Sequence, residues 1–201
     1  MGILSDSEIN AKMIELANKL EYKDFCIKNS HLTEAMKAIK TGESNEDRTN
    51  CKLASIGDSL IDLAIVLICH HSCIPNSKID NIRQDFARNE VQYQLFKDLG
   101  LFTYAYNNEH FASENDILLP NESVFVSEKG FQYLEAIIGA MYLDKGKDVT
   151  IDYIINWYLT KAVNYVRNLD NEKRAMKKDE EIDEFQEVLN KYVNSKDKIL
   201  L

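Results

Sequence analysis

The chain of 201 residues contains few of the residues that make turns: it has only two prolines and seven glycines. Folds built from β-strands need frequent turns, so this scarcity favours helices. The longest uninterrupted apolar run, residues 63–69, is too short to cross a bilayer. The first ten residues also lack the basic and then apolar order of a signal peptide. We therefore expect an all-α protein in the cytoplasm, with no membrane partner.

Basic residues and cysteines are also limited. The 24 Lys and Arg residues are outnumbered by 33 Asp and Glu residues, which gives a formal net charge of −9. Such a charge argues against an extended basic surface for nucleic acid, because that kind of binding depends on Lys and Arg contacts to phosphates. Any contact with RNA would then use a local basic rim and metal ions. The four cysteines are expected to be reduced.

Apolar residues recur every three or four positions through much of the chain, which is typical of amphipathic helices. Asp6 or Ser7 is the expected cap of the first helix. The polar stretch 42–50 is expected to be a loop, and the apolar helix at 51–71 is expected to be central. After Asn168 the sequence becomes mostly charged, with one weak apolar stripe. We predict a single domain over residues 1–168, followed at 169–201 by a connector and an amphipathic helix. The expected helices cover residues 6–21, 30–39, 51–71, 77–90, 90–99, 129–143 and a segment around 151–162.

Two apolar segments each carry one acid close to one glycine. In LASIGDSLIDLAI, residues 53–65, Gly57 precedes Asp58; in YLEAIIGAMYLDKG, residues 133–146, Glu135 lies one turn before Gly139. A glycine inside a helix costs about 1 kcal/mol relative to alanine, which suggests that it allows another helix to approach closely. Two carboxylates directed into one crevice would suit Mg²⁺. The alternative is that both acids lie at ordinary helix edges.

Four segments, in order along the chain, resemble the ribonuclease III nuclease domain. CKLASIGDSLIDLAI resembles the family's G-D-S signature, and YLEAIIGAMYLDKG resembles its second acidic helix. Between them, IDNIRQDFARNEVQYQLFKDLGL matches an intervening pattern, with Arg83 and Asn89 in register. Upstream, KLEYKDFCIKNSHLTEAM resembles the opening of the domain. The resemblance implies an all-helical, homodimeric endonuclease that cuts double-stranded RNA rather than DNA. In such an enzyme, acidic residues hold Mg²⁺ (or Mn²⁺). By this resemblance, Asp58 and Glu135 are the catalytic metal ligands.

The resemblance is incomplete at the acidic site. The positions of two family acids are occupied by Ala54 and Gln132, and a further flanking acid falls on Cys51. Gln132 can still offer a carbonyl oxygen. Asp62, one turn after Asp58, is a possible additional ligand, although an exposed acid on the far side of the helix is the alternative. LASIGDS also resembles the compact mini-ribonuclease III subclass, which has a reduced acidic site, whereas the N-terminal helices resemble the standard class. That subclass lacks a separate double-stranded RNA-binding domain, and we expect none at 169–201 here.

Other motifs favour ordinary structural roles. CHHSC, residues 69–73, has metal-binding residue types, but its adjacent histidines point apart on a helix, so a helix end is the simpler interpretation. His31 and His110 are expected to be isolated, without a Ser-His-Asp arrangement. The tyrosine-rich stretch 102–111 could stack on bases, although a core edge or a dimer surface is the competing interpretation.

Three functions follow from these patterns. The first is a metal-dependent endoribonuclease acting on double-stranded or structured RNA. The second is a catalytically impaired ribonuclease III-like protein that binds RNA or forms dimers, as the residues at 54 and 132 suggest. The third is a helical protein-interaction domain that shares only the fold.

Overall fold

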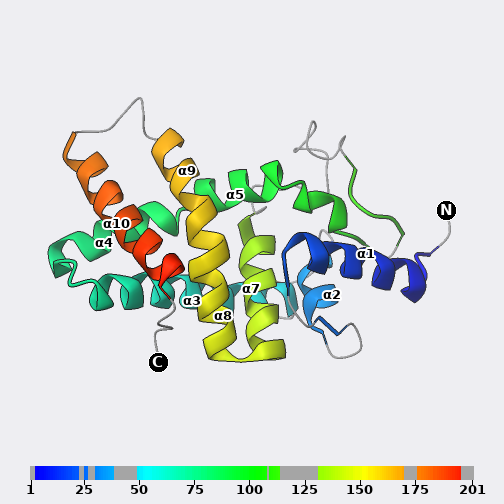
Figure 1. Ribbon diagram of the computed structural model, residues 1–201. Coiled ribbons are helices and arrows are strands. Elements are labelled where there is room, and N and C mark those ends of the chain that lie inside the picture. Colours follow the sequence, from blue (N-terminus) through cyan, green and yellow to red (C-terminus); the bar gives the residue numbers. More distant parts are fainter. Residues whose placement is uncertain are drawn as a thin grey trace. The chain divides into compact units, whose positions relative to one another are not determined.

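The computed structural model describes residues 3–22, 25–26, 30–38, 49–107, 109–113, 131–169 and 176–195. Within these ranges the ordered elements are helices, and the only β-pairing consists of two isolated bridges at Tyr106 (Figure 1). The prediction of an all-α fold is confirmed. The chain divides into two compact units that alternate along the sequence. Unit 1 comprises residues 1–57 and 96–145, and unit 2 comprises residues 58–95 and 146–201.

Unit 1 is built around α7, which packs against the short helix α2. The first helix, α1, begins at Asp6 and is capped by Ser5, whose side chain accepts from Glu8 N–H while the Glu8 carboxylate accepts from Ser5 N–H. This capping box satisfies amide groups that the first turn leaves free, so the predicted caps at Asp6 and Ser7 were wrong. The elements of unit 1 are α1 (Asp6–Lys19), α2 (Leu32–Ala35), the start of α3 (Thr49–His71), η3 (Leu101–Tyr104) and α7 (Phe131–Lys145).

Unit 2 contains the remainder of α3 and a long helical segment formed by α8, η4 and α9. The middle section, η4, is a π-helix, a rare conformation that interrupts the regular α-helical pattern. The elements of unit 2 are the end of α3, α4 (Asn76–Phe86), most of α5 (Asn89–Asp98), α8 (Lys147–Tyr153), η4 (Ile154–Leu159), α9 (Thr160–Leu169) and α10 (Met176–Asn194).

The last helix, α10, packs against α4, α9 and η4 (Figure 1). The Phe185 ring on α10 lies 4.7 Å from that of Phe86, measured between ring centroids. Glu184 forms an ion pair with Lys78 at 2.6 Å. The apolar side chains of α10 are therefore part of the core of unit 2, where Ile182, Phe185 and Leu189 are fully buried. The predicted domain division at residue 168 stays a prediction.

Helix α3 is long and strongly apolar. By length and composition alone its segment Asn50–His71 could cross a membrane, although the uninterrupted apolar run at 63–69 is too short to do so. Half of the segment is buried inside the protein, and the core helix of a water-soluble domain meets the same criterion. Two acids, Asp58 and Asp62, interrupt its middle.

The predicted helix boundaries differ from the observed ones mainly near loops. The second predicted helix, 30–39, is reduced to Leu32–Ala35 within the described residues, and position 39 lies outside them. The central helix begins at Thr49, so the predicted loop 42–50 ends earlier; residues 42–48 lie outside the described residues. The tyrosine-rich stretch contributes buried side chains, which supports the core interpretation: Phe102, Tyr104 and Tyr106.

Candidate metal centre

Helices α3 and α7 approach each other closely at two glycines of unit 1. A methyl group added to Gly57 would lie 2.7 Å from the carbonyl carbon of Glu135, and one added to Gly139 would lie 2.7 Å from the carbonyl carbon of Leu53. On each helix the two contacting positions are four residues apart. This spacing is the pattern in which the ridges of both helices interdigitate. The predicted role of these glycines in a close helix approach is confirmed.

Asp58 follows Gly57 directly on α3, and its side chain belongs to unit 2. Partial burial raises the pKa of the Asp58 carboxyl group, and the nearby carboxylate of Asp62 raises it further. The guanidinium of Arg83 acts in the opposite direction and lowers this pKa. Asp58 is an exposed residue of α3, and its carboxylate is influenced by one negative and one positive neighbour, Asp62 and Arg83.

Glu135 belongs to the part of α7 that contacts Gly57. Its residue is only 6% exposed, and α7 is buried on most sides over residues 133–141. A buried carboxylate is costly unless polar groups or a cation compensate its charge. The metal-binding role of Glu135 stays a prediction.

The predicted supporting residues are distributed over both units. In unit 2, Asp62 accepts a hydrogen bond from Arg83, so these two residues are brought together. Asp62 is partly exposed, and its role as an additional ligand stays a prediction. Asn89 is exposed at the first position of α5, and Gln132 is partly exposed on α7 in unit 1.

The acidic site is sparse. Within the described ranges no group of three or more His, Cys, Asp or Glu residues is arranged to hold a metal ion. Ala54, at the position of a family acid, is a buried apolar residue of unit 1. In the segment 69–73, Cys69 is buried and both histidines are exposed, which supports the helix-end interpretation. A cation at this centre would have few protein ligands, and water and substrate oxygens would complete its coordination.

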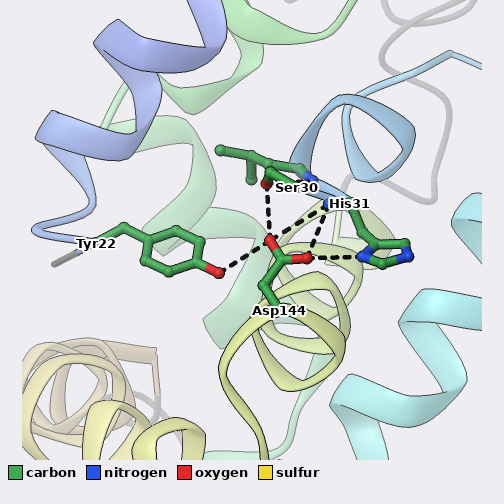
Figure 2. Close-up of polar contacts among 5 residues, drawn as sticks. Tyr22, Ser30, His31 and Asp144 are labelled. Atoms are coloured by element: carbon green, nitrogen blue, oxygen red, sulfur yellow. Dashed lines mark hydrogen bonds and ion pairs between the residues drawn. The ribbon is translucent and has the colours of Figure 1, made fainter. Parts of the chain in front are cut away.

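Sequence reasoning missed a polar network around Asp144 at the end of α7 (Figure 2). The Asp144 carboxylate accepts hydrogen bonds from the Tyr22 hydroxyl at 3.0 Å and the Ser30 hydroxyl at 2.7 Å. It also contacts the His31 backbone N–H at 3.0 Å and His31 Nδ1 at 2.7 Å. Burial raises the pKa of Tyr22, and the Asp144 charge raises it further.

The expectation that His31 is isolated was therefore wrong. The network nevertheless lacks the order of a catalytic triad, because the Ser30 hydroxyl donates to Asp144 and not to the imidazole. Its visible effect is to tie the chain before α2 to the end of α7, within unit 1. The aspartate of the Y-L-D motif was the available sequence signal, but its partners lie more than 100 residues away.

These features define an all-helical domain in which two apolar helices meet at glycines and each carries an acid beside the meeting point. Residues 51–146 match the ribonuclease III domain family, and this match supports membership of that family. The match contains Asp58, Asp62, Arg83, Asn89, Gln132 and Glu135. The ribonuclease III domain is typical of a family of nucleases that process double-stranded RNA. A search of curated proteins and a search of solved structures each gave no match.

Proposed function

We propose that the protein is a metal-dependent endoribonuclease that cuts double-stranded or structured RNA, with Asp58 and Glu135 as its metal ligands. The single observation that carries this proposal is the position of both acids within the family match. Asp58 is part of the G-D-S motif, and Glu135 begins the E-A-I-I-G-A motif.

The donor set fits a hard divalent ion. Both proposed ligands are carboxylates, and Mg²⁺ prefers oxygen ligands, often one or two carboxylates with water and phosphate oxygens; Mn²⁺ accepts similar donors. When bound, such an ion would activate a water molecule and stabilise the leaving oxygen of a phosphodiester. The protein itself would supply the negative charge that attracts the cation. The Asp58 carboxylate is repelled by the carboxylate of Asp62, and the second proposed ligand, Glu135, is a buried residue. Gln132 could add a neutral oxygen.

We further infer that the active form is a homodimer. Helix α3 carries apolar side chains that are not buried within the chain. In unit 2 these include Leu63, which is 38% exposed, and the partly exposed Val66 and Leu67. A second copy of the chain would cover these side chains and remove apolar surface from water. A cytoplasmic location stays a prediction.

Cleavage of a long RNA duplex tests the enzymatic proposal. Purified protein with Mg²⁺ or Mn²⁺ is expected to shorten the duplex, and Asp58→Asn and Glu135→Gln are each expected to reduce cleavage below detection. Asp148→Asn serves as the matched control, because it removes an exposed carboxylate from α8. Circular dichroism melting establishes that each variant is folded. Cleavage that persists in both site variants would refute the assignment.

A catalytically impaired RNA-binding or dimerising protein is the second candidate. The residues at Ala54 and Gln132 and the net charge of −9 favour it. Titration calorimetry with MnCl₂ separates the two candidates. Absence of any binding heat, together with retention of duplex RNA by the same preparation, would support the impaired protein and contradict the enzyme.

A further inference from the structure

Arg83 on α4 interacts with three carboxylates of unit 2, two through hydrogen bonds and one through its charge. It donates one guanidinium N–H to Asp62 on α3 and another to Asp80, on its own helix, at 3.3 Å. It also acts electrostatically on Asp58, which lies one turn before Asp62. Its Nε–H is buried and has no hydrogen-bond partner among the described residues. The guanidinium is therefore held mainly by its contact with Asp62, the residue one helical turn after Asp58.

The contact between Arg83 and Asp62 is easily broken. Their side chains are 38% and 33% exposed, and ion pairs of this exposure contribute little to stability, because water competes for both charges. Asp58 and Asp62 are four residues apart on one helix, so their carboxylates repel each other while both are ionised. A divalent cation at Asp58 would attract Asp62 and repel Arg83, and both effects weaken the pair.

We propose that Asp62 and Arg83 form an exchangeable pair that couples metal binding to RNA binding. The proposal rests on the proposed function, because it assumes a divalent cation at Asp58. The cation draws Asp62 away from the guanidinium, and the freed Arg83 then binds a phosphate of the RNA backbone. A guanidinium suits this role because its planar N–H groups can contact two oxygens of one phosphate. Arg83 thus acts as a positioning residue for the RNA.

Asp80 provides a matched control for this exchange. It accepts a hydrogen bond from the same guanidinium, but it lies on α4 and its side chain is 78% exposed. Asp80→Asn removes a carboxylate from Arg83 without removing Asp62. If the exchange depends on Asp62 specifically, the asparagine variants at 62 and 80 must behave differently.

The metal side is tested by calorimetric titration with MnCl₂ in the absence of RNA. Arg83→Gln is expected to bind Mn²⁺ about fivefold more tightly than the unaltered protein, because it frees Asp62 from an ion pair of modest strength. Asp62→Asn is expected to bind Mn²⁺ more weakly, and Asp80→Asn to bind it as the unaltered protein does. Equal affinity of all four proteins would overturn the exchange while leaving the metal site in place.

The RNA side is tested in EDTA by fluorescence anisotropy with a labelled RNA duplex at several KCl concentrations. Asp62→Asn is expected to bind about fivefold more tightly than Asp80→Asn, because it releases the guanidinium without metal. Its affinity should also fall more steeply with salt, by about 0.9 in log–log slope for one additional phosphate contact. The double variant with Arg83→Gln should lose both gains.

Identical RNA binding by the two asparagine variants would overturn the proposal. This measurement contains no metal, so it decides whether Asp62 withholds Arg83 from RNA even if the unaltered protein neither binds Mn²⁺ nor cuts RNA. Failure to bind Mn²⁺ would refute the proposed function and, with it, the metal half of the exchange.

Discussion

Replacing Gly57 with alanine tests the helix approach on which the candidate centre depends. The added methyl would lie 2.7 Å from the Glu135 carbonyl carbon and 3.1 Å from its Cα, whereas carbon atoms pack at about 3.5–4.0 Å. All of the opposing atoms are backbone atoms, so no side-chain rotation can relieve the contact. The two helices must therefore move apart locally by about 1 Å.

Two effects of opposite sign determine the change in stability. Alanine is favoured over glycine within a helix by about 1 kcal/mol. Overpacking of a tight core typically costs about 1–3 kcal/mol, and a clash with backbone falls at or beyond the upper end of that range. We expect Gly57→Ala to lower the free energy of unfolding by about 2 kcal/mol, measured by urea titration with circular dichroism. Ser55→Ala, on the exposed side of the same helix, should change it by less than about 0.5 kcal/mol.

Gly139→Ala is the reciprocal test, because its methyl group meets the backbone of Leu53. The double variant is expected to lose less stability than the sum of the two single losses, since one separation of the helices accommodates both methyl groups. A Gly57→Ala protein as stable as Ser55→Ala, or more stable, would refute the close approach. Strict additivity of the two glycine variants would show that the contacts are independent.

Three further predictions concern the network at Asp144, the packing of unit 2 and the buried tyrosines. Asp144→Asn should cost about 2 kcal/mol of stability, because hydrogen bonds to a charged acceptor are lost; a thermal melt equal to that of Asp148→Asn would contradict this. Tyr158→Phe should cost about 1–3 kcal/mol in urea unfolding, because the hydroxyl donates at 2.6 Å to the buried Phe86 carbonyl. An unchanged midpoint would argue against that bond. Burial raises the pKa of Tyr106 to about 12, above the usual value of about 10. The folded state favours the protonated form, so this contribution to stability is complete below about pH 10 and is lost as the pH rises toward 12. Tyr106→Phe should flatten that loss, and tyrosine absorbance showing its ionisation near pH 10 in the folded protein would exclude the shift.

Much of the helical content could be predicted because it depends on local patterns. The apolar repeat that predicted a helix at 51–71 extends over five turns, and the observed helix differs by two residues at its start. Shorter elements were predicted less well: α2 has four residues, too few for a repeat to define its ends. The Ser5–Glu8 capping box was visible as Ser-x-x-Glu, and the expected caps at Asp6 and Ser7 overlooked it.

At the candidate site, too, features that depend on neighbouring residues could be predicted, and contacts between residues far apart in the sequence could not. The two glycines predicted a close approach because a glycine has few other reasons to occupy the middle of an apolar helix. The partners of Asp62 and Asp144 could not be predicted in this way. Arg83 lies 21 residues from Asp62, and His31 lies 113 residues from Asp144. Such pairs depend on how helices pack, which no periodic pattern records.

The two missing family acids have different consequences for folding. Ala54 is buried in unit 1, so a carboxylate there would lose its hydration and would need a bound cation or another partner to compensate. Gln132 is partly exposed, so an aspartate there would keep much of its water and cost little. We infer that alanine at 54 stabilises the metal-free fold, whereas glutamine at 132 mainly weakens attraction for a cation. Of the two proposed metal ligands, Glu135 is the buried one and Asp58 is exposed, so loss of hydration bears more heavily on Glu135 than on Asp58.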